Sequence, residues 1–247
     1  MTITRLGRIC ELVRYPIKSM AGVATESAQL GWHGLDGDRR FAFRRMGDRS
    51  GFPWLSASRV PELVLYTPLG MDEHAEEPSP THVRTPAGAE LELHGSALPS
   101  EIGGRFGGEV ELMRLKHGMF DDAPVSIISL VTIAGIGDEV GVALDRRRFR
   151  ANIVIETLDS RPFLEDGWVG GRLMFGDGGA RPAVSVTARD VRCMMINLDP
   201  DTAAQDARIM RTVVELNQNN AGVYATVVQT GSIHVGQTVS LETPLLR

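Results

Sequence analysis

Short apolar runs separated by glycine and proline turns are the feature that most constrains the fold of this chain. The runs span residues 6–13, 41–44, 63–66, 110–115, 125–130, 152–155 and 223–229. Because apolar runs of about four to eight residues bounded by turn residues are typical of strands, the pattern predicts a strand-rich protein. We therefore expect a mainly β fold of the α+β class, in which a few helices cover a sheet or barrel.

Three segments depart from this pattern. Segment 206–216 has apolar residues at helical spacing, which predicts a helix, and Thr202 with Gln205 forms a candidate capping box before it. The uncharged run 123–137 is shorter than the ~20 residues that a membrane helix needs, so we expect a buried strand and a turn there. Segment 71–100 is rich in polar and turn residues and predicts a solvated excursion outside the core.

A chain of 247 residues can hold one large or two modest domains. The turn Lys116-His117-Gly118 precedes a second group of predicted strands, and we place the boundary there. This gives an N-terminal β domain over residues 1–116 and a second domain over residues 117–247, with strands that are free to interleave.

The charge balance gives no global field that would attract an anionic partner. With 26 basic and 31 acidic residues and a net charge of −5, we expect no nucleic-acid partner and no membrane partner. An anionic ligand would have to be held by a local basic cluster. The first residues, Met1-Thr2-Ile3-Thr4-Arg5, lack the apolar stretch of a secretory signal, which favours a cytoplasmic location.

Two segments of the N-terminal half are candidates for such a cluster. In Tyr15-Pro16-Ile17-Lys18-Ser19 the proline disfavours continuation of the first strand, which leaves Lys18 and Ser19 near a loop where an ammonium and a hydroxyl bind phosphate well. In Gly37-Asp38-Arg39-Arg40-Phe41, Asp38 is placed to orient Arg39. Taken alone, each segment is more often an ordinary solvated surface group or ion pair.

The third basic segment is Arg146-Arg147-Arg148-Phe149-Arg150-Ala151-Asn152, which has four arginines within five residues. Like charges at this spacing repel unless solvent or an anion compensates them, so a solvated turn and an anion site are equally good interpretations. If the strand begins here, Arg150 and Asn152 face the same side. The absence of interleaved aromatic residues disfavours RNA binding.

The two cysteines have different surroundings. Cys10, on an alternating strand, is expected to be a packing residue, whereas Cys193 follows Arg189 and Arg192, whose positive charge favours a thiolate that ligates a metal or attacks an electrophile. A lone cysteine is more often a small buried hydrophobe. With no CxxC pattern, neither structural zinc nor a disulfide framework is indicated, and a Cys10–Cys193 disulfide stays open.

Taken together and in this order, these segments and the later Asp199-Pro200 resemble the MOSC family, including its N-terminal β-barrel domain. The resemblance spans nearly the whole chain and is nearest to the amidoxime-reducing components and their bacterial counterparts. It implies a MOSC β-barrel domain packed with an N-terminal β-barrel-like domain. It also implies a molybdenum cofactor, Mo-molybdopterin, and no pyridoxal phosphate.

By this resemblance Cys193 is the catalytic thiolate and the metal ligand. The implied pterin and phosphate contacts are Lys18, Ser19, Arg39, Arg150 and Asn152. The implied reaction is reduction of small N-hydroxylated substrates, hydroxylamines and amidoximes. Because no cysteine-rich ferredoxin segment is present, electrons are expected from a separate donor protein, ferredoxin-like or a reductase.

The chain departs from its relatives near the expected pocket. Asp122-Ala123 stands where the amidoxime reducers have Thr-Ser, and Ala151 replaces a proline. Ile196 and Asn197 stand where the family often has threonines, which changes the substrate pocket. Three other functions stay open: a molybdopterin carrier without turnover, a sulfurtransferase that uses a Cys193 persulfide, and an interaction module with a relict site.

Overall fold

A computed structural model describes residues 1–72 and 77–243, and its main element is a closed β-barrel of seven strands. The seven barrel strands are β1 (Thr2–Arg14), β10 (Val125–Ser129), β11 (Ile153–Thr157), β12 (Arg172–Phe175), β13 (Ala183–Val191), β14 (Asn220–Gln229) and β16 (Thr238–Thr243). An eighth strand of the same sheet, β2 (Val23–Thr25), pairs with β1 outside the closed ring. Their order is β11-β10-β14-β13-β12-β16-β1-β2, and an additional β1–β11 pairing closes the barrel. The predicted mainly β class is confirmed.

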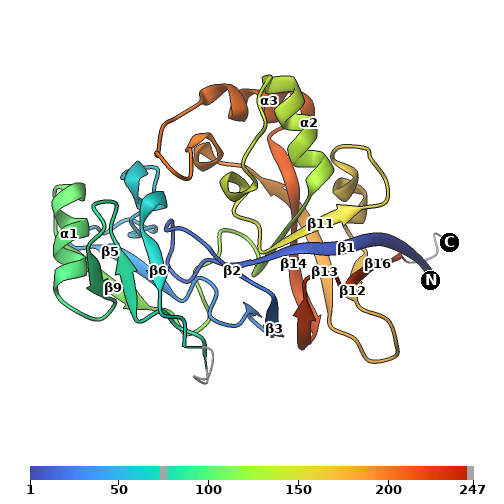
Figure 1. Cartoon of the computed structure of the whole chain (residues 1–247), viewed down its shortest axis with the longest axis horizontal. Coiled ribbons are helices and arrows are strands. Elements are labelled where there is room, and N and C mark those ends of the chain that lie inside the picture. The colour runs from blue at the N-terminus through green and yellow to red at the C-terminus, as the bar shows by residue number, and fades with distance from the viewer. Residues whose placement is uncertain (73–76, 244–247) are drawn as a thin grey trace.

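Strand β1 closes the barrel because it is long enough to pair with two neighbours. It is antiparallel to β16 along Thr2–Arg8 and to β11 along Gly7–Leu12, with register shifts in both ladders. Alternating residues of these strands point inward, and twenty buried residues fill the interior. The N-terminal strand therefore lies among C-terminal strands, next to the C-terminal end of the described chain (Figure 1).

The other strands form three smaller sheets beside the barrel (Figure 1). They are β3 (Ser27–Gly31), β4 (Gly34–Leu35) and β15 (Gly231–His234); β5 (Phe41–Arg45) and β9 (Val110–Arg114); and β6 (Thr67–Leu69), β7 (His82–Arg84) and β8 (Glu90–Glu92). Helix α1 (Ala97–Phe106) packs on β8 and β9. Val83, Leu93 and Leu98 are buried in a second apolar core, separate from the barrel interior. The prediction that segment 71–100 lies outside the core was therefore wrong for these residues. Residues 73–76 of that segment lie outside the described chain.

Two helices pack together against one side of the barrel and enclose a third core (Figure 1). Helix α3 (Ala207–Asn217) confirms the predicted helix, but its N-cap is Asp206, which accepts from Arg208 N, and not the expected capping box. Helix α2 (Leu130–Val140) corrects the prediction of a turn after β10. Ser129 ends the strand and caps the helix by accepting from Thr132 N at 3.2 Å.

Four short 3₁₀ helices complete the regular structure of the described residues. They are η1 (Pro61–Leu65), η2 (Arg146–Phe149), η3 (Leu164–Trp168) and η4 (Met194–Asn197). Within the described residues, the helices are too short or too polar to span a membrane. Both cysteines are free thiols, so the disulfide that the sequence left open is not formed.

Candidate functional site

A cavity of about 60 Å³ lies where the barrel meets the N-terminal segments, and it contains most of the predicted site residues. It is lined by Lys18, Ser19, Arg39, Asp121, Ser126, Arg148, Phe149, Arg150, Asp190, Val191, Arg192, Cys193, Met195, Ile196 and Tyr224. The fold thus brings together five of the six predicted residues, from four separate parts of the chain. Asn152 is the exception.

Cys193 is placed at the cavity by the end of a barrel strand. Strand β13 ends at Val191, and Cys193 is the extended N-cap residue of η4, with its carbonyl accepting from Ile196 N at 3.3 Å. The residue is exposed, so its thiol is reachable by a ligand. Cys10, in contrast, packs against the third core, and burial raises the pKa of its thiol to about 11.

The two arginines that precede Cys193 are engaged by the protein itself. Arg192 is buried and pairs with Asp190 at 2.9 Å, while it donates to the carbonyls of Ala221 and Phe149, both at 2.6 Å. Arg189 lies 3.4 Å from the carboxylate of Asp166. The positive charge inferred from sequence around the thiol is therefore largely compensated by carboxylates.

Lys18 and Ser19 follow β1 and form one side of the cavity. Lys18 N donates to Phe41 O at 2.8 Å, which fixes the chain against β5, and the lysine side chain is only 11% exposed. Ser19 is buried with a φ of 67°, and its Oγ lies 4.0 Å from Met195 Sδ. An ammonium and a hydroxyl thus face the same small space.

Arg39 and Arg150 also line the cavity, and both guanidinium groups lie near the ring of Tyr15. Their guanidinium carbons lie 5.7 Å and 4.2 Å from the centroid of Tyr15. Arg39 Nη2 donates to Arg150 O at 3.2 Å, and Arg150 Nη1 donates to Met20 O at 2.6 Å. Burial, together with the charge of Arg39, lowers the pKa of Arg150, so a bound anion would stabilise this pair.

The other three arginines of the basic segment are paired with carboxylates. The pairs are Arg146–Glu11 at 2.6 Å, Arg147–Asp201 at 2.6 Å and Arg148–Asp199 at 2.7 Å. Among the described residues, no such ion pair is formed by Arg150. The expectation that Arg150 and Asn152 share one face of a strand was wrong, because Arg150 is the left-handed residue that ends η2 and β11 begins only at Ile153.

Asn152 is a buried bridge and does not line the cavity. Its Nδ2 donates to Val13 O at 3.1 Å, and its Oδ1 accepts from Ser126 N at 3.1 Å and from Arg39 Nη1 at 3.3 Å. All its bonding groups are used within the protein. Asn152 therefore positions the guanidinium group of Arg39 through a hydrogen bond and does not itself reach the cavity.

Two acidic residues in the cavity were not predicted from sequence. Asp190 is buried beside Arg192 and accepts from Ser126 Oγ at 2.8 Å; burial raises the pKa of its carboxyl, against the effect of Arg192. Asp121 lines the cavity, and its Oδ1 lies 2.9 Å from Lys18 Nζ. Asp122 is exposed and does not line the cavity.

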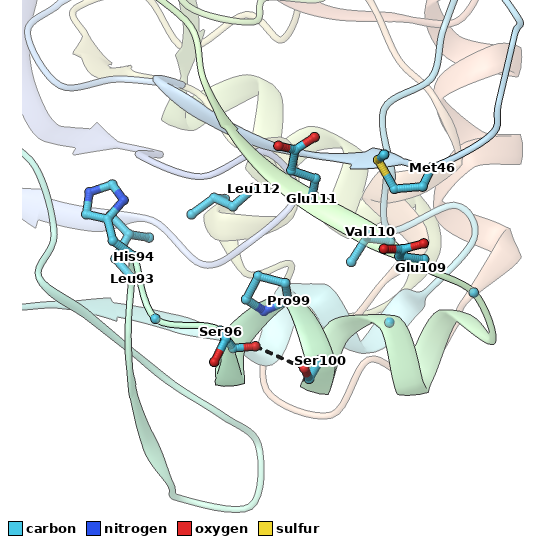
Figure 2. A pocket seen from close by; sticks show the side chains of 13 residues that line it. Met46, Leu93, His94, Ser96, Pro99, Ser100, Glu109, Val110, Glu111 and Leu112 are labelled. Atoms are coloured by element: carbon cyan, nitrogen blue, oxygen red, sulfur yellow. Dashed lines mark hydrogen bonds between the residues drawn. The ribbon is translucent and has the colours of Figure 1, made fainter.

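A second cavity of about 200 Å³ adjoins the first one. It has an apolar lining that includes Val13, Val64 and Leu198, and it shares Arg148, Arg150 and Met195 with the smaller cavity. A wider groove of about 960 Å³ lies elsewhere, between α1 and β9, where Glu109 and Glu111 are the charged groups (Figure 2). None of the predicted site residues lines this groove.

The combination of a β-barrel, an exposed thiol at a strand end and a facing basic cluster agrees with what family models find in the sequence. The chain belongs to the MOSC domain family: the MOSC domain matches residues 114–240, and the MOSC N-terminal beta barrel domain matches residues 6–99. MOSC domains are associated with the molybdenum cofactor. Among curated proteins, none matches the chain.

A solved structure shares this fold. The YuaD protein from Bacillus subtilis is similar with a TM-score of 0.54 and 13% identity, over 98% of this chain and 98% of that one. YiiM from Geobacillus stearothermophilus is similar with a TM-score of 0.35 and 16% identity, over 49% of this chain and 54% of its own. YiiM from Escherichia coli aligns over 50% of this chain and 56% of its own, with a TM-score of 0.36 and 12% identity.

Proposed function

We propose that this protein binds the molybdenum cofactor in the cavity at Cys193 and reduces small N-hydroxylated compounds, hydroxylamines and amidoximes. The observation that carries the proposal is the convergence on one cavity of an exposed thiol and of cationic groups from Lys18, Arg39 and Arg150. With Cys193, these residues come from four regions of the sequence, and the fold alone brings them together.

The donor set suits the proposed group. A thiolate is a soft ligand that matches a molybdenum centre bound to sulfur, and an ammonium with two guanidinium groups matches a phosphate tail. The 60 Å³ cavity is small, but the adjoining 200 Å³ cavity shares Arg148, Arg150 and Met195 with it and offers room for a flat ring system. The residues present therefore fit the cofactor.

When bound, the cofactor would supply oxygen-atom removal: an N-hydroxylated compound, two electrons and two protons give the reduced amine or amidine and water. Cys193 would hold the metal, and Lys18, Ser19, Arg39 and Arg150 would bind the phosphate. Ile196 gives the cavity wall beside Cys193 an apolar character. Asn197 is buried and its Oδ1 accepts from Met210 N at 2.9 Å, so it attaches η4 to helix α3.

The first experiment measures molybdenum and pterin in protein made in a host that synthesises the cofactor. We expect metal and pterin in the wild type, and pterin without metal in Cys193→Ser. Cys10→Ser is the matched control, because Cys10 is a packing thiol, and it should keep both. Absence of metal from the wild type, while a second molybdenum enzyme from the same host is loaded, would refute the proposal.

The second experiment measures hydroxylamine and amidoxime consumption with a reduced dye as electron donor. Turnover that is lost in Cys193→Ser supports the reductase. Bound pterin and metal with no turnover would make the protein a cofactor carrier. A persulfide on Cys193 after incubation with a cysteine desulfurase, in protein without metal, would instead favour sulfur transfer.

A further inference from the structure

The predicted phosphate site already contains a negative charge from the protein itself. Asp121 Oδ1 lies 2.9 Å from Lys18 Nζ, and Asp121 lines the same cavity as Arg39 and Arg150. The partial loss of water around this carboxyl would raise its pKa, but Lys18, followed by the two arginines, holds the pKa below its ordinary value. The carboxylate is thus charged at neutral pH and paired with the group that a phosphate would bind.

We propose that Asp121 occupies the anion site as an internal substitute for a phosphate, and that an incoming phosphate group must displace it. The proposal rests on the proposed function, in which this cavity binds a phosphate-bearing cofactor. It makes Asp121 a residue that decides which anions the site accepts. This anion selection depends on the carboxylate of Asp121.

The exposure of the two partners shows which one can leave. The Lys18 side chain is 11% exposed and is fixed beneath the ring of Phe52, whereas the Asp121 side chain is 65% exposed. The cation is therefore a fixed part of the cavity and the carboxylate closes it from outside. Displacement of Asp121 moves a group into water, where it is well solvated, and leaves the core undisturbed.

The backbone of residues 120–123 lies between two attached positions, Met119 and the start of β10 at Val125. Between β9 and β10, Met119 N donates to Arg39 O at 2.9 Å, and His117 Nδ1 lies 3.0 Å from His33 Nε2. Beyond this point, no backbone–backbone hydrogen bond holds residues 120–123 within the chain that the structure describes. The segment can swing Asp121 out of the cavity without breaking secondary structure.

The exchange favours ligands with more charge than a carboxylate. Partly exposed ion pairs contribute little to stability, so Asp121 is a weak competitor. A phosphate group carries a higher charge and more acceptor oxygens, and it can bind Lys18, Arg39 and Arg150 together. A singly charged carboxylate ligand gains little over Asp121. The site therefore selects phosphate over simple carboxylates.

The test is calorimetric titration with inorganic pyrophosphate at low ionic strength, where charge effects are strongest. We expect Asp121→Asn to bind roughly tenfold more tightly than the wild type, because a competing charge near the site is removed. The matched control is Asp122→Asn, which makes the same change in net charge at an exposed neighbour outside the cavity and should change affinity less than about twofold. Lys18→Met should bind most weakly.

Equal or weaker binding by Asp121→Asn would overturn the proposal, since Asp121 would then orient Lys18 instead of competing with the ligand. If Asp122→Asn bound pyrophosphate as tightly as Asp121→Asn, the gain in affinity would come from net charge alone. This result would also overturn the proposal. Failure of the proposed function is distinguishable. Tighter binding by Asp121→Asn in protein that never acquires molybdenum or pterin would leave the displacement in place and refute only the cofactor. No binding of pyrophosphate to any variant would refute the displacement, whereas the metal and pterin content of the protein decides the proposed function.

Discussion

Asn152 connects three segments through a single amide, and none of its atoms is left for a ligand. The amide joins Val13 at the end of β1, Ser126 in β10 and the guanidinium of Arg39. A buried polar side chain of this kind stabilises by satisfying partners that would otherwise lose their hydrogen bonds to water. Its influence on the cavity passes through the position of Arg39.

We predict that Asn152→Ala lowers the free energy of unfolding by about 1–3 kcal/mol, because buried backbone groups of Val13 and Ser126 lose their partner. Urea denaturation followed by circular dichroism measures this change. Gln205→Ala, which removes an exposed amide, is the control and should have little effect. A stability loss no larger than that of the control would show that the bridge is not formed.

For single residues, the sequence predicts which chemical groups serve a site better than it predicts which side chains point into the cavity. The charged and sulfur-bearing residues Lys18, Arg39, Arg150 and Cys193 were predicted because their chemistry is distinctive and because a family resemblance links them, and the fold places them at one cavity. The choice of Asp121 over Asp122 was missed. Two adjacent residues on an irregular segment differ only in which one the tertiary structure turns inward, and no periodicity in the sequence records this.

The junction between β10, α2 and η3 is held by a buried carboxyl group. Glu165 of η3 accepts from Ser129 Oγ at 2.9 Å and from Thr132 Oγ1 at 2.8 Å, and Ser129 is also the N-cap of α2. The residue is fully buried. Burial raises the pKa of Glu165 above its ordinary value, because the charged form loses its solvation there.

This junction predicts a specific pH dependence of stability. Below the ordinary glutamate pKa of about 4.3, both the folded and the unfolded protein carry a protonated Glu165, and the contribution of the group is fully present. As pH rises through the raised folded pKa, the unfolded state loses its proton more easily and this contribution is lost.

The stability of the wild type relative to Glu165→Gln should therefore decrease between acidic and alkaline pH in urea titrations. Glu215→Gln, an exposed change on α3, is the control and should show no such trend. A stability difference between wild type and Glu165→Gln that stays constant with pH would contradict the assignment.

The same junction explains why helix α2 was not predicted from the sequence. Strands were found from short apolar runs, and α3 from its helical spacing. The run 123–137 was assigned to a strand and a turn, because β10 and α2 follow each other directly at Ser129 and their buried residues merge into one apolar run. A single residue that ends a strand and caps a helix leaves no polar break for sequence reasoning to detect.

At the scale of the whole molecule, the two sequence domains share one barrel. Strand β1 comes from the N-terminal part and pairs with both β11 and β16, and β15 returns from the C-terminal part to pair with β3. Two family models match the chain, over residues 6–99 and 114–240, and the division into domains at residues 116 and 117 stays a prediction. The interleaving means that neither unit has all its strands alone.

We predict that residues 117–247 expressed alone do not fold, because without β1 the edges of β11 and β16 stay unpaired and the barrel interior is open. Calorimetry should show no cooperative transition for this fragment and a single transition for the full chain. Coexpression with residues 1–116 should restore a folded complex. A soluble fragment with its own sharp transition would contradict the shared barrel.

The closure of the barrel by β1 also orders events in time. The pairing of Thr2 with Thr243 joins residues that are separated by almost the entire described chain, and contacts of such long sequence separation form slowly. During synthesis on the ribosome, β1 emerges early, and its first residues must remain unpaired until β16 has followed. The strand that closes the barrel is thus the strand whose pairing is completed last, and chaperones would protect the nascent chain during this period.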